Sequence, residues 1–265
     1  MKPSWSVVVA VVALLAPCAA AQDIQAEARA ALAPTGKLRV ALLTLPHMAV
    51  RNQPTGQFTG VIVDLGRELA KRLNVPVEFA AVTSNIAAVD QVRDGAADLT
   101  FLVALPMLAA QIDFGPAYIE YETSFLVRTE APIHGIEDID IPGFKIIVPE
   151  SGASMTRLRE TLKTVKLIGV PIAIGSAQRV VEMLKSGEAD AYSNLTHLLS
   201  LTESNLPGWR IVPGSYMRTV FSIGYPKHRP AGAAYLQQFI EEMKKSGFIQ
   251  RSIGRANLKG AVAPK

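Results

Sequence analysis

The sequence predicts an α/β protein of two lobes, each a mostly parallel sheet flanked by helices. Short apolar runs alternate with segments of helical period through the first half of the chain, and the alternation restarts after residue 142. Strands and helices that alternate at this pitch are typical of βαβ units, whose parallel sheets are covered on both faces. Extended segments at residues 120–128 and 216–225 flank the second series. They predict that the chain crosses between the lobes twice.

The first lobe starts with a polar, alanine-rich helix over residues 22–33, which the sequence Pro34-Thr35-Gly36 ends. The alternating elements expected after it are a strand at 38–44, a helix at 61–73, a strand at 75–82, a helix at 86–93 and a strand at 99–103. The stretch 120–128 is rich in β-forming residues and forms the first crossing.

The second lobe repeats the pattern without a sequence repeat that can be aligned. Its expected elements are strands at 144–148, 166–174 (broken by Pro171), 189–193 and 209–212, and helices at 154–163, 178–185 and 195–201. After the second crossing a helix at 231–245 returns to the first lobe. The predicted division is a signal peptide at 1–21, the first part of lobe 1 at 22–126, lobe 2 at 127–217, and a return to lobe 1 with C-terminal helices at 218–265.

Composition excludes several classes of protein. With 265 residues, 49% of them apolar and 19% charged, the chain can bury a large core and is neither disordered nor fibrous. The formal net charge is +4, and the basic residues are scattered without a basic run or interleaved aromatics. Nucleic acid is therefore not expected as a partner.

The amino terminus has the features of an export signal. Lys2 precedes an apolar run at residues 7–15, and small residues end at Ala21, after which we expect cleavage. The run is shorter than the roughly 20 apolar residues that span a bilayer. Lipid attachment at Cys18 is the alternative, although Pro17 stands where such sites have a small flexible residue. Removal of the signal leaves no cysteine, which fits a large domain in a Gram-negative periplasm.

Four patches carry a family resemblance: residues 36–43 (GKLRVALL), 60–65 (GVIVDL), 95–99 (GAADL) and 113–118 (DFGPAY). In this order and spacing they resemble the amino-terminal lobe of the family 3 periplasmic solute-binding proteins, the receptors of polar amino-acid ABC importers. The resemblance implies a type II periplasmic-binding-protein-like clamshell with hinges near residues 125–129 and 216–220. It also implies a monomer whose partners are a small-molecule ligand and an inner-membrane ABC permease.

The first two loops expected to face the ligand follow strands of lobe 1, because ligands of open α/β sheets bind beyond the carboxyl ends of strands. Loop 44–48 contains Thr44 and His47, in the region where relatives have a ligand-stacking aromatic. His47 would donate to the ligand or simply be solvated. In loop 104–108, relatives that bind amino acids read Thr-Pro-x-Arg, and the positions of that threonine and arginine are Leu105 and Leu108 here.

Loss of the arginine changes the expected ligand. A buried carboxylate without a partner costs several kcal/mol, so the site is a poor host for a free α-amino acid unless other groups donate. Leu105 and Leu108 are either core residues of a repacked loop or the apolar wall of a pocket.

Lobe 2 contributes the remaining candidates. In loop 148–155, Ser151 and Ser154 suit the start of a helix. The free N–H groups of that helix end would attract an anion, or a serine would simply serve as its N-cap. Glu150 would pair with a ligand amine or stay solvated. Residues 187–191 resemble the family's Gly-x-x-Asp-Ala, with a structural aspartate, and the acid that usually grips the ligand ammonium a few residues later is replaced by Asn194.

No motif predicts a cofactor, a metal or a catalytic centre. The histidines lack metal-ligand spacing, and there is no Gly-x-Ser-x-Gly, P-loop or Gly-x-Gly-x-x-Gly sequence. The leading hypothesis is a periplasmic receptor for an ABC importer. One alternative is a sensory or accessory binding module that does not transport. Another is a dehydratase for cyclohexadienyl substrates on the same scaffold, with Glu150 as the acid and Ser151 and Ser154 as orienting groups.

Overall fold

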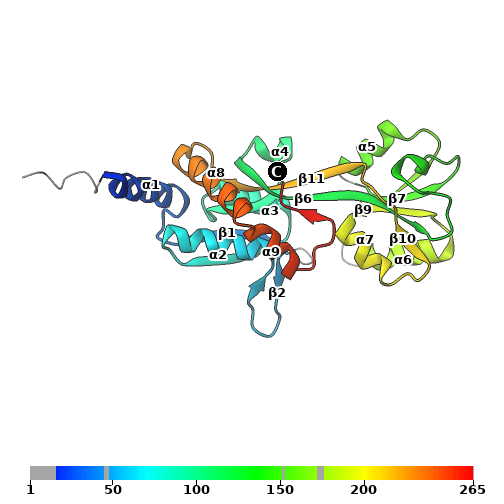
Figure 1. The fold of residues 1–265 in the computed structure, drawn as a ribbon, viewed down its shortest axis with the longest axis horizontal. Coiled ribbons are helices and arrows are strands. Elements are labelled where there is room, and N and C mark those ends of the chain that lie inside the picture. The colour runs from blue at the N-terminus through cyan, green and yellow to red at the C-terminus, as the bar shows by residue number, and fades with distance from the viewer. Residues whose placement is uncertain (1–15, 45–47, 151–152, 172–175, 265) are drawn as a thin grey trace, which may run out of the picture.

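The computed structural model describes residues 16–44, 48–150, 153–171 and 176–264. It has two α/β halves joined by the long strands β6 (Asp113–Arg128) and β11 (Met217–Tyr225), as Figure 1 shows. The α/β class and the two crossings expected from the sequence are confirmed.

The first half contains every described element before β6 and those after β11. Before β6 they are α1 (Ala16–Leu32), β1 (Leu38–Leu43), β2 (Val50–Arg51), β3 (Phe58–Thr59), α2 (Val61–Leu73), β4 (Val77–Val82), α3 (Asn85–Arg93), β5 (Leu99–Val103) and α4 (Pro106–Ala109). After β11 they are α8 (Pro230–Lys245), α9 (Phe248–Arg255) and β12 (Ala261–Val262). The predicted cleavage after Ala21 falls within α1.

The second half lies between the two crossings. Its elements are the 3-10 helix η1 (Ile136–Ile139), β7 (Lys145–Pro149), α5 (Ala153–Thr161), β8 (Lys166–Val170), α6 (Ser176–Ser186), β9 (Ala191–Leu195), α7 (Thr196–Glu203) and β10 (Trp209–Ile211).

Both halves belong to one hydrogen-bonded sheet rather than to two separate sheets. The strand order is β4-β1-β5-β11-β6-β9-β7-β8, with β10 and β12 also paired to β6. The outer trios β4-β1-β5 and β9-β7-β8 are parallel, whereas β11 and β6 pair antiparallel with their neighbours. The sheet is continuous because β6 pairs with β11 as far as Thr123 and with β9 from Thr123 onward.

The buried core divides in the same way as the strands. Two clusters of buried apolar side chains in the described chain draw only on residues up to Tyr121 and from Phe221 onward. The other two draw only on residues from Phe125 to Val212. The lobe boundaries expected after residues 126 and 217 stay a prediction, but the division of the core agrees with a crossing in these two regions.

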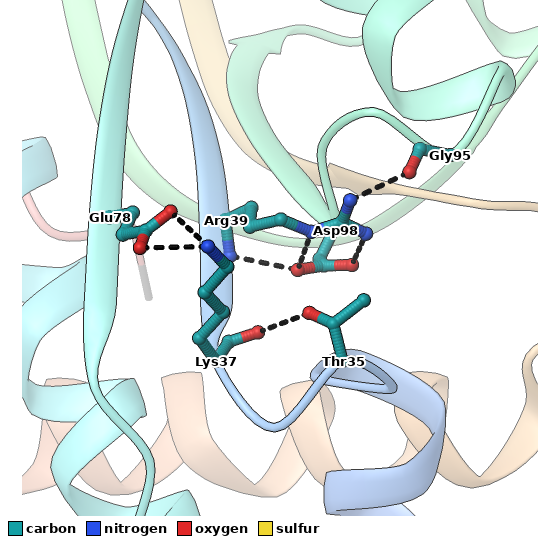
Figure 2. A network of polar contacts seen from close by, with 6 residues as sticks. All are labelled: Thr35, Lys37, Arg39, Glu78, Gly95 and Asp98. Carbon is teal, nitrogen blue, oxygen red and sulfur yellow. Dashed lines mark hydrogen bonds and ion pairs between the residues drawn. The ribbon is translucent and has the colours of Figure 1, made fainter.

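A partly buried ion pair joins two neighbouring strands of the first half. The Asp98 carboxylate, 3% exposed, accepts hydrogen bonds from the Arg39 backbone N–H at 2.8 Å, from Nε at 3.0 Å and from Nη2 at 2.6 Å. The Arg39 Nη1 group donates to the Gly95 carbonyl at 2.9 Å, and Figure 2 shows the whole network. Asp98 therefore ties β1 to the turn that leads into β5.

The second half contains the same arrangement. The Asp190 carboxylate accepts from the Lys145 backbone N–H at 2.9 Å, and the Lys145 ammonium donates to the Gly187 carbonyl at 3.1 Å. Asp98 and Asp190 each also donate a backbone N–H to the residue they hold, both at 2.8 Å. The aspartate of the Gly-x-x-Asp-Ala sequence thus has a structural position, and the halves repeat each other in geometry without an alignable sequence.

Several elements differ from the sequence prediction. Helix 61–73 and strand 99–103 are confirmed to the residue. The first crossing begins at Asp113 rather than 120, because β11 pairs with it through a bulge despite Gly115 and Pro116. The strand expected at 166–174 ends at Val170, and residues 172–175 lie outside the described chain. The β2–β3 hairpin, α4, η1 and β12 were not predicted, and α9 was expected only as a further C-terminal helix without stated bounds.

Replacement of Asp98 by alanine should destabilise the protein more than replacement of Asp190. Asp98→Ala removes a buried carboxylate with its hydrogen bonds and leaves the Arg39 side chain, which is 22% exposed, without that partner, so it should lower the free energy of unfolding by about 2 kcal/mol. Asp190→Ala should lose about 1 kcal/mol, because the Lys145 ammonium bonds a carbonyl rather than the carboxylate. Urea denaturation measures both values, and equal losses would contradict this account.

The Asp140 carboxylate should make stability pH-dependent. Backbone N–H groups of Thr164 and Lys163 lower the pKa of Asp140 below its ordinary value of 3.8. A lowered folded-state pKa contributes stability above the unfolded pKa and loses it as the pH falls through the folded pKa. Asp140→Asn should therefore be less stable than the natural chain at pH 7, with the difference vanishing well below pH 3.8. Thermal unfolding at a series of pH values measures this, and a constant difference would disprove it.

Candidate functional site

The loops chosen from the sequence follow β1, β5 and β7 in the fold. Figure 1 shows α4, which follows β5, and α5, which follows β7, on the same side of β6 and β11, one over each half. Thr44 is exposed at the end of β1. His47 and Ser151 lie outside the described residues. Their roles, and those of the other candidate ligand contacts, stay predictions.

Leu105 and Leu108 belong to the turn that starts α4. The Leu105 carbonyl accepts hydrogen bonds from the backbone N–H groups of Leu108 and Ala109, both at 2.9 Å. The Leu108 side chain is 3% exposed and packs in the cluster beneath α3. Leu105 is half-buried against the same cluster. Leu108 is thus a core side chain in this structure, and Leu105 is the one that keeps some exposed surface.

Glu150 has a fixed backbone and an exposed side chain. Its N–H donates to the Val170 carbonyl at 3.0 Å. Gly169 on β8 permits this close approach, because a Cβ there would lie 2.9 Å from the Glu150 Cβ. The carboxylate is exposed beyond the end of β7. It is the one formal charge among the described residues of the three predicted loops.

Three hydroxyl groups meet beneath the first turn of α5. The Tyr216 Oη lies 2.6 Å from the Ser193 Oγ, and the Ser154 hydroxyl also hydrogen-bonds to Tyr216. The Tyr216 ring stacks on Phe125 with centroids 4.9 Å apart and an interplanar angle of 23°. Burial raises the pKa of Tyr216, and the two serine bonds oppose that rise. The start of α5 is thus joined to β9 and to both crossings.

Sequence reasoning did not identify Tyr216 or Ser193 as part of the site. Each stands in a predicted strand, with no local pattern that distinguishes it from other polar strand residues. Only the pairing of Phe125 with Ser193 and the bond from the Tyr216 N–H to the Thr123 carbonyl, 3.1 Å, bring them together.

Asn194 lies on the other face of β9. Its Oδ1 accepts from the Leu195 backbone N–H at 2.8 Å, and its Nδ2 donates to the Tyr192 hydroxyl. Because side chains alternate along a strand, Asn194 shares a face with Tyr192, which packs toward α6, whereas Ser193 faces α5. The structure therefore brings Ser154 and Tyr216 together and separates Asn194 from them.

Acidic side chains also line the crossing strands. Arg218 of β11 pairs with Glu120 at 3.2 Å and with Glu122 at 3.4 Å across the ladder. In the part of the chain that the structure describes, no three histidine, cysteine or acidic residues gather as metal ligands would. No described helix has the length and apolar character needed to cross a membrane.

A surface pocket of about 620 Å³ lies elsewhere, between the β2–β3 hairpin and α9. Its acid, Asp64, accepts hydrogen bonds from Ser252 and from Arg255, the latter at 2.6 Å. The charged groups of this pocket are thus paired with each other.

The family model for the bacterial extracellular solute-binding proteins, family 3, matches residues 38–255. The chain therefore belongs to this family, whose members bind small solutes. The resemblance noted in the sequence and the type II periplasmic-binding-protein fold are both confirmed. Comparison with curated protein sequences gave no match.

Solved structures share the fold at low sequence identity. A putative binding component of an ABC transporter from Wolinella succinogenes, complexed with lysine, has a TM-score of 0.68 at 20% identity and covers 83% of this chain and 95% of its own. AbpA, the substrate-binding protein of an amino-acid ABC transporter from Streptococcus pneumoniae, is also similar in its complex with L-arginine. It has a TM-score of 0.64 at 20% identity, and the match covers 85% of this chain and 96% of AbpA.

An ancestral amino-acid-binding protein described as a precursor of cyclohexadienyl dehydratase is also similar. It has a TM-score of 0.63 at 22% identity and covers 84% of this chain and 96% of its own. At these identities the likeness concerns the fold.

Removal of the Tyr216 hydroxyl should cost more than removal of another buried tyrosine hydroxyl. Tyr216→Phe keeps the stack on Phe125 but leaves the fully buried Ser193 hydroxyl without its bond, which should lower the free energy of unfolding by about 1–2 kcal/mol. Tyr121→Phe is the matched control, because the buried Tyr121 hydroxyl has no hydrogen-bond partner, and its loss should be close to neutral. Equal losses in urea denaturation would rule out a structural role for the Tyr216 hydroxyl.

Proposed function

We propose that this protein is a periplasmic receptor that captures a small solute between its two halves and delivers it to the inner-membrane permease of an ABC importer. The observation that carries the proposal is the pair of βα halves joined by β6 and β11, with the loops after β5 and β7 on the same side of the crossings. Two crossings restrict the halves to closing around one axis. Membership of the solute-binding family supports capture of a small ligand.

The ligand that fits best carries a cationic group and lacks a carboxylate. Leu108, which packs in the core, stands at the position that the sequence resemblance assigns to a carboxylate-binding arginine, and the described residues of the three loops include no lysine or arginine. A ligand carboxylate would be desolvated there without a cation, which is penalised by several kcal/mol. Glu150 instead offers an exposed negative charge beside the start of α5. An amine would pair with it, and the Ser154 hydroxyl would add a polar contact.

Matched ligand pairs test this preference. Agmatine and cadaverine keep the side chains of arginine and lysine but lack the α-carboxylate, so they should raise the thermal unfolding temperature while the amino acids should not. A ligand that binds only the folded state stabilises that state by about 2.7 kcal/mol when the ligand concentration is 100 times its Kd. Glu150→Gln should abolish most of this shift, whereas Glu160→Gln, a change at an exposed acid near the other end of α5, should preserve it.

Either of two results would overturn the preference for a cation. One is a shift with arginine or lysine and none with the amines. The other is release of a carboxylate ligand from gently purified protein in native mass spectrometry. If no small molecule binds, the result favours the alternative hypothesis of a sensory or accessory module over a solute receptor.

Export is part of the same proposal. The mature protein should begin at Gln22 and appear in the periplasmic fraction. A lipid found on Cys18 would show instead that the protein is attached to the membrane.

Turnover of prephenate or arogenate that disappears in Glu150→Gln would instead assign the dehydratase role.

A further inference from the structure

The last described strand, β12, lies at the point where the crossing strand passes from one half to the other. Ala261 of β12 pairs with Tyr121 of β6, and Leu195 at the end of β9 pairs with Thr123. β12 and β9 therefore occupy one edge of β6 end to end, with Glu122 between them. Figure 1 shows β12 beside β6. This strand lies beyond residues 38–255, the part of the chain that the family model matches.

Glu122 is held by both neighbours. Its backbone N–H donates to the Gly260 carbonyl at 3.3 Å, and its carbonyl accepts from the Thr196 hydroxyl at 2.9 Å. Thr196 is the first residue of α7, in the second half. The next residue, His197, packs its ring on Tyr121 with centroids 4.5 Å apart. The carboxyl-terminal segment and α7 thus meet at a single residue of the crossing strand.

The segment is anchored in one half and touches the other. Leu258 and Ala261 are 4% and 6% exposed and pack in the core of the first half. Gly260, between them, has a φ of +71° and lies so close to Thr196 that a Cβ on it would be 2.5 Å from the Thr196 Cβ. Only a glycine satisfies both conditions, because a side chain here would meet the strain of positive φ and a clash.

We propose that β12 is a brace that limits bending of the hinge at Glu122. Rotation of the halves requires the backbones of the crossing strands to bend, and on β6 the pairing passes from β11 to β9 near residues 122–124. Rotation in one direction presses Thr196 against Gly260, and rotation in the other breaks the bond from Thr196 to Glu122. The brace therefore narrows the range of relative positions of the two halves. The inference depends on the fold and not on the identity of a ligand.

Spin-label distances between the halves test the brace without any ligand. With Cys18 replaced by serine, labels at Lys71→Cys on α2 and Lys185→Cys on α6 occupy exposed sites, one in each half. Double electron–electron resonance should give a narrow distance distribution in this parent. Gly260→Ala should broaden and shift the distribution. It should also speed hydrogen exchange at the Glu122 amide.

Gly143→Ala is the matched control. Gly143 has a φ of +75°, close to that of Gly260, but no atom lies within 4 Å of the position of its Cβ. It introduces the same backbone strain without a clash and should leave the distribution unchanged. Thr196→Gly added to Gly260→Ala removes the clashing Cβ together with the hydroxyl bonded to Glu122, so it should reverse the shift of the mean distance without restoring the parent width. A Gly260→Ala distribution identical to that of the parent, or equal broadening in Gly143→Ala, would overturn the proposal.

Discussion

One strand, β6, holds the two halves of the molecule together. Its 16 residues pair with β11 on the first half's side and with β9 and β10 in the second half, so a single run of backbone hydrogen bonds makes one continuous sheet. Relative motion of the halves must therefore pass through this strand and β11. The candidate site is also connected to β6, because the Tyr216 ring stacks on Phe125 of that strand.

The two halves repeat one local design around that strand. In each, the first parallel strand lies between the other two, in the orders β4-β1-β5 and β8-β7-β9. In each, an aspartate before the third strand accepts the backbone N–H of a basic residue on the first strand. Asp98 adds an ion pair to Arg39, and the corresponding ammonium of Lys145 bonds a carbonyl instead. The patches of family sequence thus mark positions that hold the sheets together, which explains why they indicate a fold without specifying a ligand.

The candidate site is built on this frame with mostly uncharged groups. Leu108 contributes to the core, the Asn194 amide bonds its own chain, and the hydroxyl groups of Ser154, Tyr216 and Ser193 bond one another. Glu150 alone offers a formal charge in the described loops. Under the proposed function, this arrangement would discriminate between solutes chiefly by the charge that a single carboxylate selects and by the cost of desolvating a ligand of the wrong charge.

The sequence by itself determined the class of fold, most of the helices and strands, and the absence of an arginine at position 108, because periodicity and residue type are local properties of the chain. Tertiary structure decided the features that depend on pairing. The register of β9 against β6 placed Asn194 and Ser193 on opposite faces, and no local pattern encodes that register. Likewise β12, with two residues, is too short to show a strand period, and only its pairing with β6 makes it a strand.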